Sequence, residues 1–236
     1  MADVNGDGLE DVYLGGAKGS AGQLFLQSSN GTFIKSNQQV FELDKVAEDT
    51  DAIFFDANGN GFLDLLVTSG GNEAAFGTAE LADRLYLNNG KGNFTKAENN
   101  GLESLRHSTS VVKALDVNGD GAMDLFIGGR LIPFVYGVNA SSFILINDGQ
   151  GNFKDATAEL APQLKEIGLV TDAALVDYDG DGKDDLILVG EWMAPTFFKN
   201  TGKQLEKIEM PEMQAYKGWY RTIQVGDFNN YGKPDF

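Results

Sequence analysis

Five short stretches of the chain place oxygen-bearing side chains at alternate positions and close on one further aspartate. In "DVNGDGAMD", Asp116, Asn118 and Asp120 lie two residues apart, Gly121 follows, and Asp124 stands at the ninth position. Alternate residues of a tight loop can turn their side chains toward one centre, and calcium takes about six to eight oxygen ligands. The glycine permits the sharp turn that such a loop needs. The spacing therefore predicts a loop that binds a hard cation.

The pattern recurs along the 236 residues at starts that are 53, 60, 61 and 50 residues apart. The copies are "DVNGDGLED" at 3–11, "DANGNGFLD" at 56–64, "DVNGDGAMD" at 116–124, "DYDGDGKDD" at 177–185 and "DFNNYGKPD" at 227–235. A single copy would be interpreted as an ordinary surface turn, because Asp, Asn and Gly are common turn residues. Regular repetition between strand-like segments favours the metal-binding interpretation instead.

The expected side-chain ligands differ in charge from loop to loop. They are Asp3, Asn5, Asp7, Asp11, Asp56, Asn58, Asn60, Asp64, Asp116, Asn118, Asp120, Asp124, Asp177, Asp179, Asp181, Asp185, Asp227, Asn229 and Asp235. The Asp177 loop offers four carboxylates, whereas the last loop has Tyr231 at its fifth position. Because more carboxylates favour tighter calcium binding, we expect the Asp177 loop to bind best, the Asp56 loop weakly, and the Asp227 loop weakest or not at all.

About three to five calcium ions are expected, in a structural role. The formal net charge is −17, and clustered carboxylates repel one another when no cation lies between them. Bound ions would therefore hold the turns between strands together. Magnesium stays open as the ion, although it requires a stricter octahedron and keeps more water.

Strand-like segments flank the loops and must position them. "DAIFFD" precedes one loop, "LLVTSGG" follows it, and "LYLNNGKGNF" then combines two further apolar runs with a turn. Asn-Gly and Asp-Gly pairs between such runs, the latter in "ILINDGQGNF", indicate hairpins, because Asn and Gly accept positive φ. Four antiparallel strands per repeat predict an all-β fold, a β-propeller of four-stranded blades, in one region over 1–236. The linker "KDATAELAPQLKEIG" is expected to form a helical turn.

The pattern "DVNGDGxxDLxxGG" followed by "LxLNxGxGxF" resembles the FG-GAP and VCBS repeats of integrin α-subunit propellers and bacterial secreted proteins. In "VGEWMAPTFFKN" and "GWYRTIQVGDFNN" the chain looks closest to bacterial VCBS proteins of the ASPIC/UnbV-associated group. The resemblance covers essentially the whole chain. It implies a calcium-binding propeller, usually of about seven blades, used for extracellular recognition, with the ligands at the positions given above. Asn60 and Tyr231 depart from the pattern.

About four blades are visible, and the chain starts and stops at acidic loops. We expect it to be part of a larger ring. The alternative is a small ring in which the last strand completes the first blade. No signal peptide is seen, and because "MADVNGDG" already lies inside a motif copy, we expect the natural N-terminus to be missing and the location to be extracellular, at the cell surface or periplasmic.

The composition excludes several partners and sites. A charge of −17 argues against nucleic acid, whose phosphates such a chain would repel. The chain has no cysteine, so disulfides and thiolate metal sites are excluded. No apolar run approaches the length of a membrane span, and no membrane insertion is expected in this segment.

The loops on the rim opposite the acidic loops predict a ligand-binding face. They carry Arg130, Tyr136, Glu191 and Trp192, and exposed aromatic side chains with mixed charge could bind a sugar or a peptide. The alternative is that Trp192 and Phe134 pack between blades, since large aromatic residues are usually buried.

The leading hypothesis is a calcium-binding, non-enzymatic module that recognises an extracellular protein or glycan. One alternative is the propeller part of a secreted polysaccharide lyase or hydrolase, and another is a structural adhesion scaffold. No catalytic motif is found: His107 has no G-x-S-x-G elbow or acid partner beside it and is expected to be a surface or packing residue.

Overall fold

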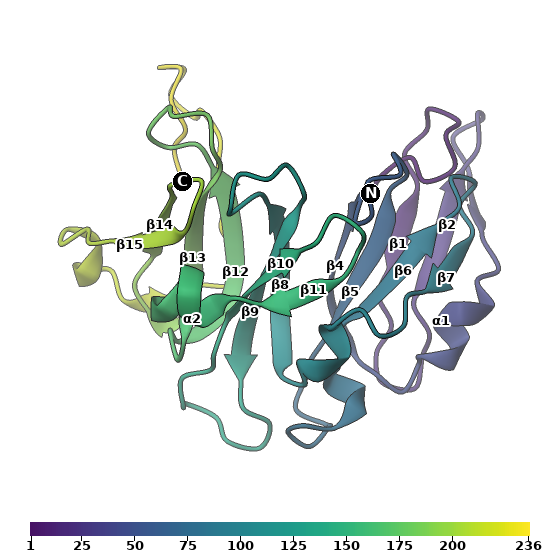
Figure 1. The fold of residues 1–236 in the computed structure, drawn as a ribbon, viewed down its shortest axis with the longest axis horizontal. Helices are drawn as coiled ribbons and strands as arrows, with labels where there is room; N and C mark the ends of the chain where they lie inside the picture. The colour runs from purple at the N-terminus through teal and green to yellow at the C-terminus, as the bar shows by residue number, and fades with distance from the viewer. The chain divides into compact units, whose positions relative to one another are not determined.

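The computed structural model describes residues 1–236, and the chain forms successive antiparallel sheets (Figure 1). The first sheet holds β1 (Val12–Leu14), β2 (Gln23–Gln27) and β3 (Phe33–Lys35). The second holds β4 (Asp49–Phe55), β5 (Asp64–Ser69), β6 (Arg84–Asn88) and β7 (Phe94–Lys96). The third holds β8 (Ser108–Leu115), β9 (Asp124–Leu131), β10 (Phe143–Asn147) and β11 (Phe153–Asp155). The fourth holds β12 (Leu169–Val176), β13 (Asp185–Met193), β14 (Thr196–Asn200) and β15 (Leu205–Ile208), with β16 (Gly218–Trp219) paired to β13.

Helical segments are short and lie between the strands. They are α1 (Gln39–Leu43), α2 (Thr157–Leu160) and the 3₁₀ segments η1 (Ala79–Leu81), η2 (Leu102–Ser104), η3 (Pro162–Leu164) and η4 (Met213–Ala215). The helical turn expected in the linker before β12 is confirmed by α2 and η3. None of the helices is both long and apolar enough to span a membrane.

Each sheet has its strands in chain order, which confirms the expected all-β fold of propeller-type blades. The acidic loop joins the first and second strands of the second, third and fourth sheets, and a tight hairpin joins the last two. The second strands are buried along most of their length, as in β5, where all six residues are buried. They therefore appear in the sequence as continuous apolar runs and not as an alternation.

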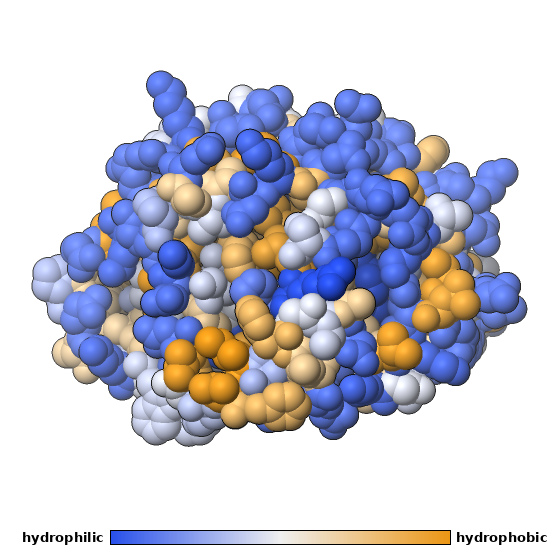
Figure 2. Space-filling view, turned by 60° about the horizontal axis from the view of Figure 1, so that its bottom comes forward, coloured by the Kyte–Doolittle hydropathy of each residue, from blue (hydrophilic) through white to orange (hydrophobic).

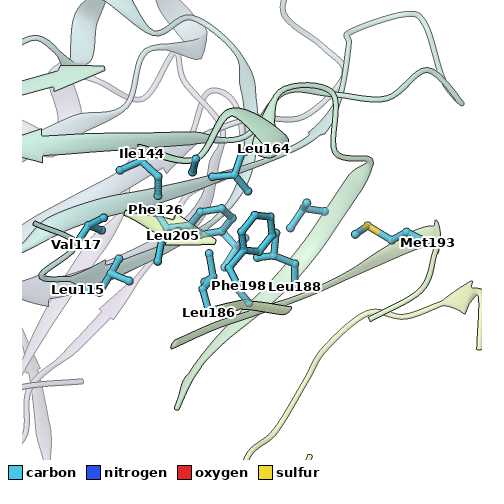
Figure 3. Close-up of a cluster of buried hydrophobic side chains, with 14 residues drawn as sticks. Leu115, Val117, Phe126, Ile144, Leu164, Leu186, Leu188, Met193, Phe198 and Leu205 are labelled. Carbon is cyan, nitrogen blue, oxygen red and sulfur yellow. The ribbon is translucent and has the colours of Figure 1, made fainter. Parts of the chain in front are cut away.

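The chain divides into two compact units, each with its own apolar core. The first comprises 1–109 with 147–153, and the second 110–146 with 154–236. In the first, Phe41 packs edge-on against Tyr86, with their ring centroids 5.0 Å apart, within a cluster that includes Leu65. In the second, Phe126 and Phe198 lie among aliphatic side chains from β13 and β15 (Figure 3). Removing these side chains from water is the main stabilising contribution of each unit.

The first unit also buries a carboxyl group that lacks a full set of partners. Asp83 Oδ1 accepts hydrogen bonds from the Ser69 amide at 2.8 Å and the Thr109 hydroxyl at 3.0 Å. Its Oδ2 has no hydrogen-bond partner. Burial raises the pKa of Asp83 to about 7, outweighing the hydrogen bonds and the charge of Arg84. A proton on Oδ2 removes the cost of a buried, half-satisfied carboxylate.

This carboxyl group predicts a pH-dependent stability of definite sign. Between its ordinary pKa of 3.8 and about 7, the folded state holds one more proton than the unfolded state. The Asp83 contribution to the free energy of unfolding therefore falls as pH rises, by up to about 1.4 kcal/mol per pH unit, and levels off above pH 7. Asp83→Asn removes this contribution.

Urea unfolding in a chelating buffer at several pH values between about 4.5 and 8 measures the effect. Glu73→Gln, which neutralises an exposed carboxylate in the same unit, is the matched control and retains the slope. Equal pH slopes in the wild type and Asp83→Asn would contradict the assignment.

Candidate metal loops and ligand-binding face

The five acidic loops share one turn, organised by the aspartate at position 1. Asp3 accepts hydrogen bonds from the amides of Gly6 at 2.8 Å and Gly8 at 2.7 Å. Both glycines have positive φ, +78° and +82°, a conformation that side chains with a Cβ rarely adopt. In the last loop Asn230 takes the place of the first glycine with φ +59°, which Asn tolerates better than most residues.

The aspartate at position 9 joins three of the loops to the end of a later strand of the same sheet, at Gln27, Asn88 and Asn200. Asp11, Asp64, Asp124 and Asp185 are fully buried. Asp64 accepts hydrogen bonds from the Ala57 amide at 3.1 Å and the Asn88 amide at 2.8 Å. Burial raises the pKa of Asp64 and of Asp185 above the ordinary value, against the opposing effect of these backbone donors. The closing aspartate is therefore a structural link whether or not a cation is bound.

An asparagine at the end of the third strand joins neighbouring repeats. The Asn88 side-chain amide donates to the Leu63 carbonyl of its own loop at 2.9 Å and to the Val4 carbonyl of the preceding loop at 2.8 Å. Asn147 reaches the Ala57 carbonyl at 2.8 Å, and Asn200 the Asp116 carbonyl at 2.9 Å. The sequence prediction missed this role. The signal was the Asn of "LYLN", "ILIN" and "FFKN", interpreted there only as part of a hairpin.

One loop gathers its carboxylates as a cation site requires. One ligand oxygen from each of Asp177, Asp179 and Asp185 lies within 4.8 Å of the others. Three hard oxygen donors converging from one loop fit a hard cation such as calcium. The other four loops do not gather three acidic side chains in this way.

Lys199 lies beside this cluster, and the sequence prediction did not foresee it. Its ammonium group forms an ion pair with Asp179 and a second one with Asp181 at 3.3 Å. The side chain of Asp181, expected to be a ligand, instead contacts Lys199 and, at 3.2 Å, Lys183. The matching positions in the other repeats are apolar, Leu26, Leu87 and Ile146. The loop with four carboxylates thus carries its own counter-charge.

In three of the remaining loops an asparagine side chain donates a hydrogen bond to a carboxylate of the same loop. In the last loop the Tyr231 side chain is exposed, and the Asn229 amide donates to Asp235 at 3.0 Å. In the loops at Asp3 and Asp116, the asparagine donates to the fifth-position carboxylate, from Asn5 to Asp7 at 3.1 Å and from Asn118 to Asp120 at 2.7 Å. The order of affinities stays a prediction.

The second unit brings together all four residues expected on the ligand-binding face. Glu191 is buried, and its carboxylate accepts hydrogen bonds from Arg130 at 2.7 Å and from the Tyr136 hydroxyl at 2.7 Å. The Trp192 indole donates to the Tyr136 oxygen at 3.2 Å. Burial raises the pKa of Glu191, but hydrogen bonds from Tyr136 and Arg130 and the nearby guanidinium charges outweigh it and lower the pKa. Glu191 is therefore an ionised centre that orients the residues around it.

Two further residues complete this group. Trp219 pairs with Glu191 across β16 and β13, and its ring centroid lies 5.0 Å from that of Trp192 at an angle of 56°. Arg221 lies 5.6 Å above the Trp219 ring and 3.5 Å from the Glu191 carboxylate. The sequence prediction quoted "GWYRTIQ" without assigning these residues. The pairing of β16 with β13 brings Trp219 and Arg221 close to Glu191. We call these six residues the Glu191 cluster: Arg130, Tyr136, Glu191, Trp192, Trp219 and Arg221.

The alternative that large aromatic residues pack between blades is wrong. Trp192 is 62% exposed and Phe134 is 68% exposed. Both have positive φ, +62° and +65°, a conformation that costs energy for bulky residues and often accompanies functional sites. His107, by contrast, packs edge-on against Phe76 with ring centroids 5.1 Å apart, as expected of a packing residue.

Comparisons with known proteins agree with the fold. A model of the FG-GAP-like repeat matches residues 3–67, 69–127 and 177–236. Among solved structures, the chain is similar to a lectin of Agrocybe aegerita described as specifically recognising non-reducing terminal N-acetylglucosamine. The match has a TM-score of 0.55 and 23% sequence identity and covers 88% of this chain. This chain matches only 49% of the lectin. No curated protein matches the sequence.

The closing aspartate predicts a stability effect that does not depend on metal. Asp64→Asn leaves one of two buried backbone donors without an acceptor and lowers the free energy of unfolding by about 1–3 kcal/mol, even in a chelator. Glu98→Gln, which neutralises an exposed carboxylate in the same unit, is the control and costs less than about 0.5 kcal/mol there. Equal losses in the two variants would contradict the structural role.

The ion pairs of Lys199 predict that this lysine weakens cation binding at the Asp177 loop. Lys199→Met removes the ammonium group that competes for Asp179 and Asp181, so the calcium dissociation constant of the Asp177 loop falls roughly threefold to fivefold. Isothermal titration calorimetry measures the change. Lys203→Met, in the same hairpin and without an ion pair, is the control. An unchanged or weaker calcium affinity in Lys199→Met would contradict the prediction.

Proposed function

Because the chain belongs to the FG-GAP-like repeat family, we propose that it is a calcium-stabilised recognition module that binds a glycan at the Glu191 cluster. The family match and the lectin neighbour both point to a non-catalytic recognition module, so an enzymatic role is not proposed. The observation that carries the proposal is the exposed Trp192–Trp219 pair fixed around a buried, ionised Glu191.

The Glu191 cluster has the composition of a sugar site. The apolar faces of pyranose rings stack on aromatic side chains, and fixed polar groups set the orientation of the hydroxyls. Trp192 and Trp219 supply 62% and 49% exposed rings. Hydrogen bonds link Trp192 to Tyr136 and Tyr136 to Glu191, which hold the cluster in place before a ligand arrives. Such preorganisation reduces the entropy lost on binding.

The face of the molecule drawn in Figure 2 lacks a broad apolar patch. In Figure 2 the visible face is mostly hydrophilic, and its hydrophobic residues form small separate groups. A large obligate protein interface would require a continuous apolar patch. The face in view is therefore consistent with a module that contacts its ligand through a small area.

The proposed role of calcium is to stiffen the loops between strands. In the Asp177 loop the ion would be held by Asp177, Asp179 and Asp185. Its charge would offset repulsion among carboxylates in a chain of net charge −17. Because the ligands at the first, third and fifth positions of the loops are exposed or partly exposed, affinities in the range of extracellular modules are expected. This supports a location outside the cytoplasm, where calcium is abundant.

Thermal unfolding tests the calcium part of the proposal. Adding calcium to the chelated protein raises the melting temperature, and the rise grows with calcium concentration because only the folded loops bind the ion. Magnesium at equal concentration gives a clearly smaller rise, since loops of this kind do not offer its strict octahedron. Equal melting temperatures with and without calcium would remove calcium from the proposal.

Binding to an array of oligosaccharides tests the recognition part. Trp192→Ala lowers affinity for any glycan that binds by at least about tenfold, as expected for a central aromatic contact. Phe33→Ala, which removes an exposed aromatic side chain in the first unit, leaves affinity unchanged. Absence of any bound glycan, or equal effects of both substitutions, would overturn glycan recognition at this cluster.

A further inference from the structure

The Glu191 cluster is locally cationic in a strongly acidic chain. Two guanidinium groups, those of Arg130 and Arg221, lie beside the one carboxylate of Glu191, so the cluster has a net charge of about +1. The chain as a whole has a net charge of −17. The six residues of the cluster therefore carry a net charge opposite in sign to that of the chain. The charge of the ligand can account for this local positive charge.

A pocket next to the cluster is lined by further positively charged side chains. It has a volume of about 340 Å³, and its lining includes Glu191, Trp192, Lys207 and Lys217. Glu191 is the one acidic residue in that lining. Lys207 forms an ion pair with exposed Glu209 at 3.2 Å. This volume lies at the lower end of the range for small-molecule sites and suits one or two sugar rings better than a folded partner.

The arrangement disfavours a cationic ligand. The Glu191 carboxylate is buried and already accepts hydrogen bonds from Arg130 and Tyr136. Arg221 already lies over the ring of Trp219, so that aromatic face has its own cation. An arriving ammonium group would meet guanidinium and lysine charges with no free carboxylate to offset them.

The arrangement favours an anion attached to an apolar ring face. The side chain of Arg221 is 61% exposed, and a guanidinium presents a planar set of donors that matches a carboxylate. Trp192 offers a 62% exposed ring and packs against Trp219, over which Arg221 lies. A carboxylated pyranose combines the two required features: a ring face that stacks on the indole and a carboxylate that pairs with the guanidinium.

We propose that the Glu191 cluster and its pocket select sugars that carry a carboxylate, with Arg221 and Lys217 as the residues that pair with it. This inference rests on the proposed function and narrows it from glycans in general to acidic glycans. Trp192 supplies the stacking surface for neutral and acidic sugars alike. Glu191 is a positioning residue that holds Arg130 and Tyr136.

The test compares two ligands that differ only in charge. A glucuronate-terminated disaccharide and its methyl ester are titrated into the full chain by calorimetry at one fixed calcium concentration. The acid binds at least about tenfold more tightly than the ester, and this preference shrinks as salt is added. Arg221→Gln lowers affinity for the acid by at least about tenfold and leaves the ester unchanged.

Control variants distinguish the preference for carboxylated sugars from glycan recognition in general. Trp192→Ala weakens both ligands, whereas Lys203→Gln, which removes an exposed positive charge from the hairpin after β14, weakens neither. Equal binding of acid and ester would overturn the preference for carboxylated sugars while leaving glycan recognition intact. Binding of the acid that survives both Arg221→Gln and Lys217→Gln would also overturn it. Failure of both ligands, and of every neutral glycan, would overturn the proposed function as well.

Discussion

The buried aspartate that closes each of the first four acidic loops makes the hydrogen bonds on which the repeats depend. Its two oxygens accept backbone hydrogen bonds from two separate segments, as when Asp185 binds the amides of Tyr178 at 3.3 Å and Asn200 at 2.7 Å. One segment is the loop itself, and the other is the end of the third strand. A buried carboxylate is stable only when such donors surround it. The loop and the strand must therefore form together.

Two further features of each repeat build on this link. The aspartate at position 1 holds the turn through the amides of its glycines, which directs the intervening side chains outward, where a cation can reach them. The asparagine whose backbone amide donates to the closing aspartate, such as Asn88 or Asn200, also donates its side-chain amide to the preceding loop. Calcium would thus strengthen a turn whose backbone is already organised. The loops can keep their shape even where the ligand set is poor, as in the last loop with Tyr231.

The same register that positions the loops also builds the ligand-binding face. Arg130 and Glu191 each lie six residues beyond the closing aspartate of their own loop. Equivalent positions of successive repeats thus carry opposite charges. The guanidinium of Arg130 and the carboxylate of Glu191 form an ion pair at 2.7 Å. β16 then pairs with β13 and adds Trp219. A few side chains at repeated positions thus form one site, whose net charge is positive whereas that of the whole chain is negative.

The sequence by itself determined the repeat, the four-stranded units and the residues of the loops. These depend on local spacing: glycine and asparagine at turns and apolar runs in strands act within a few residues of one another. It also indicated Arg130, Tyr136, Glu191 and Trp192 as a group, because the loops that carry them recur in register. Only the tertiary structure decided that Lys199 contacts the Asp177 loop, that Asn88 joins two repeats, and that Trp219 and Arg221 join Glu191. Those contacts link residues 18 to 84 positions apart. A pairing across strands is fixed by hydrogen-bond register and packing, which no local pattern of residues encodes.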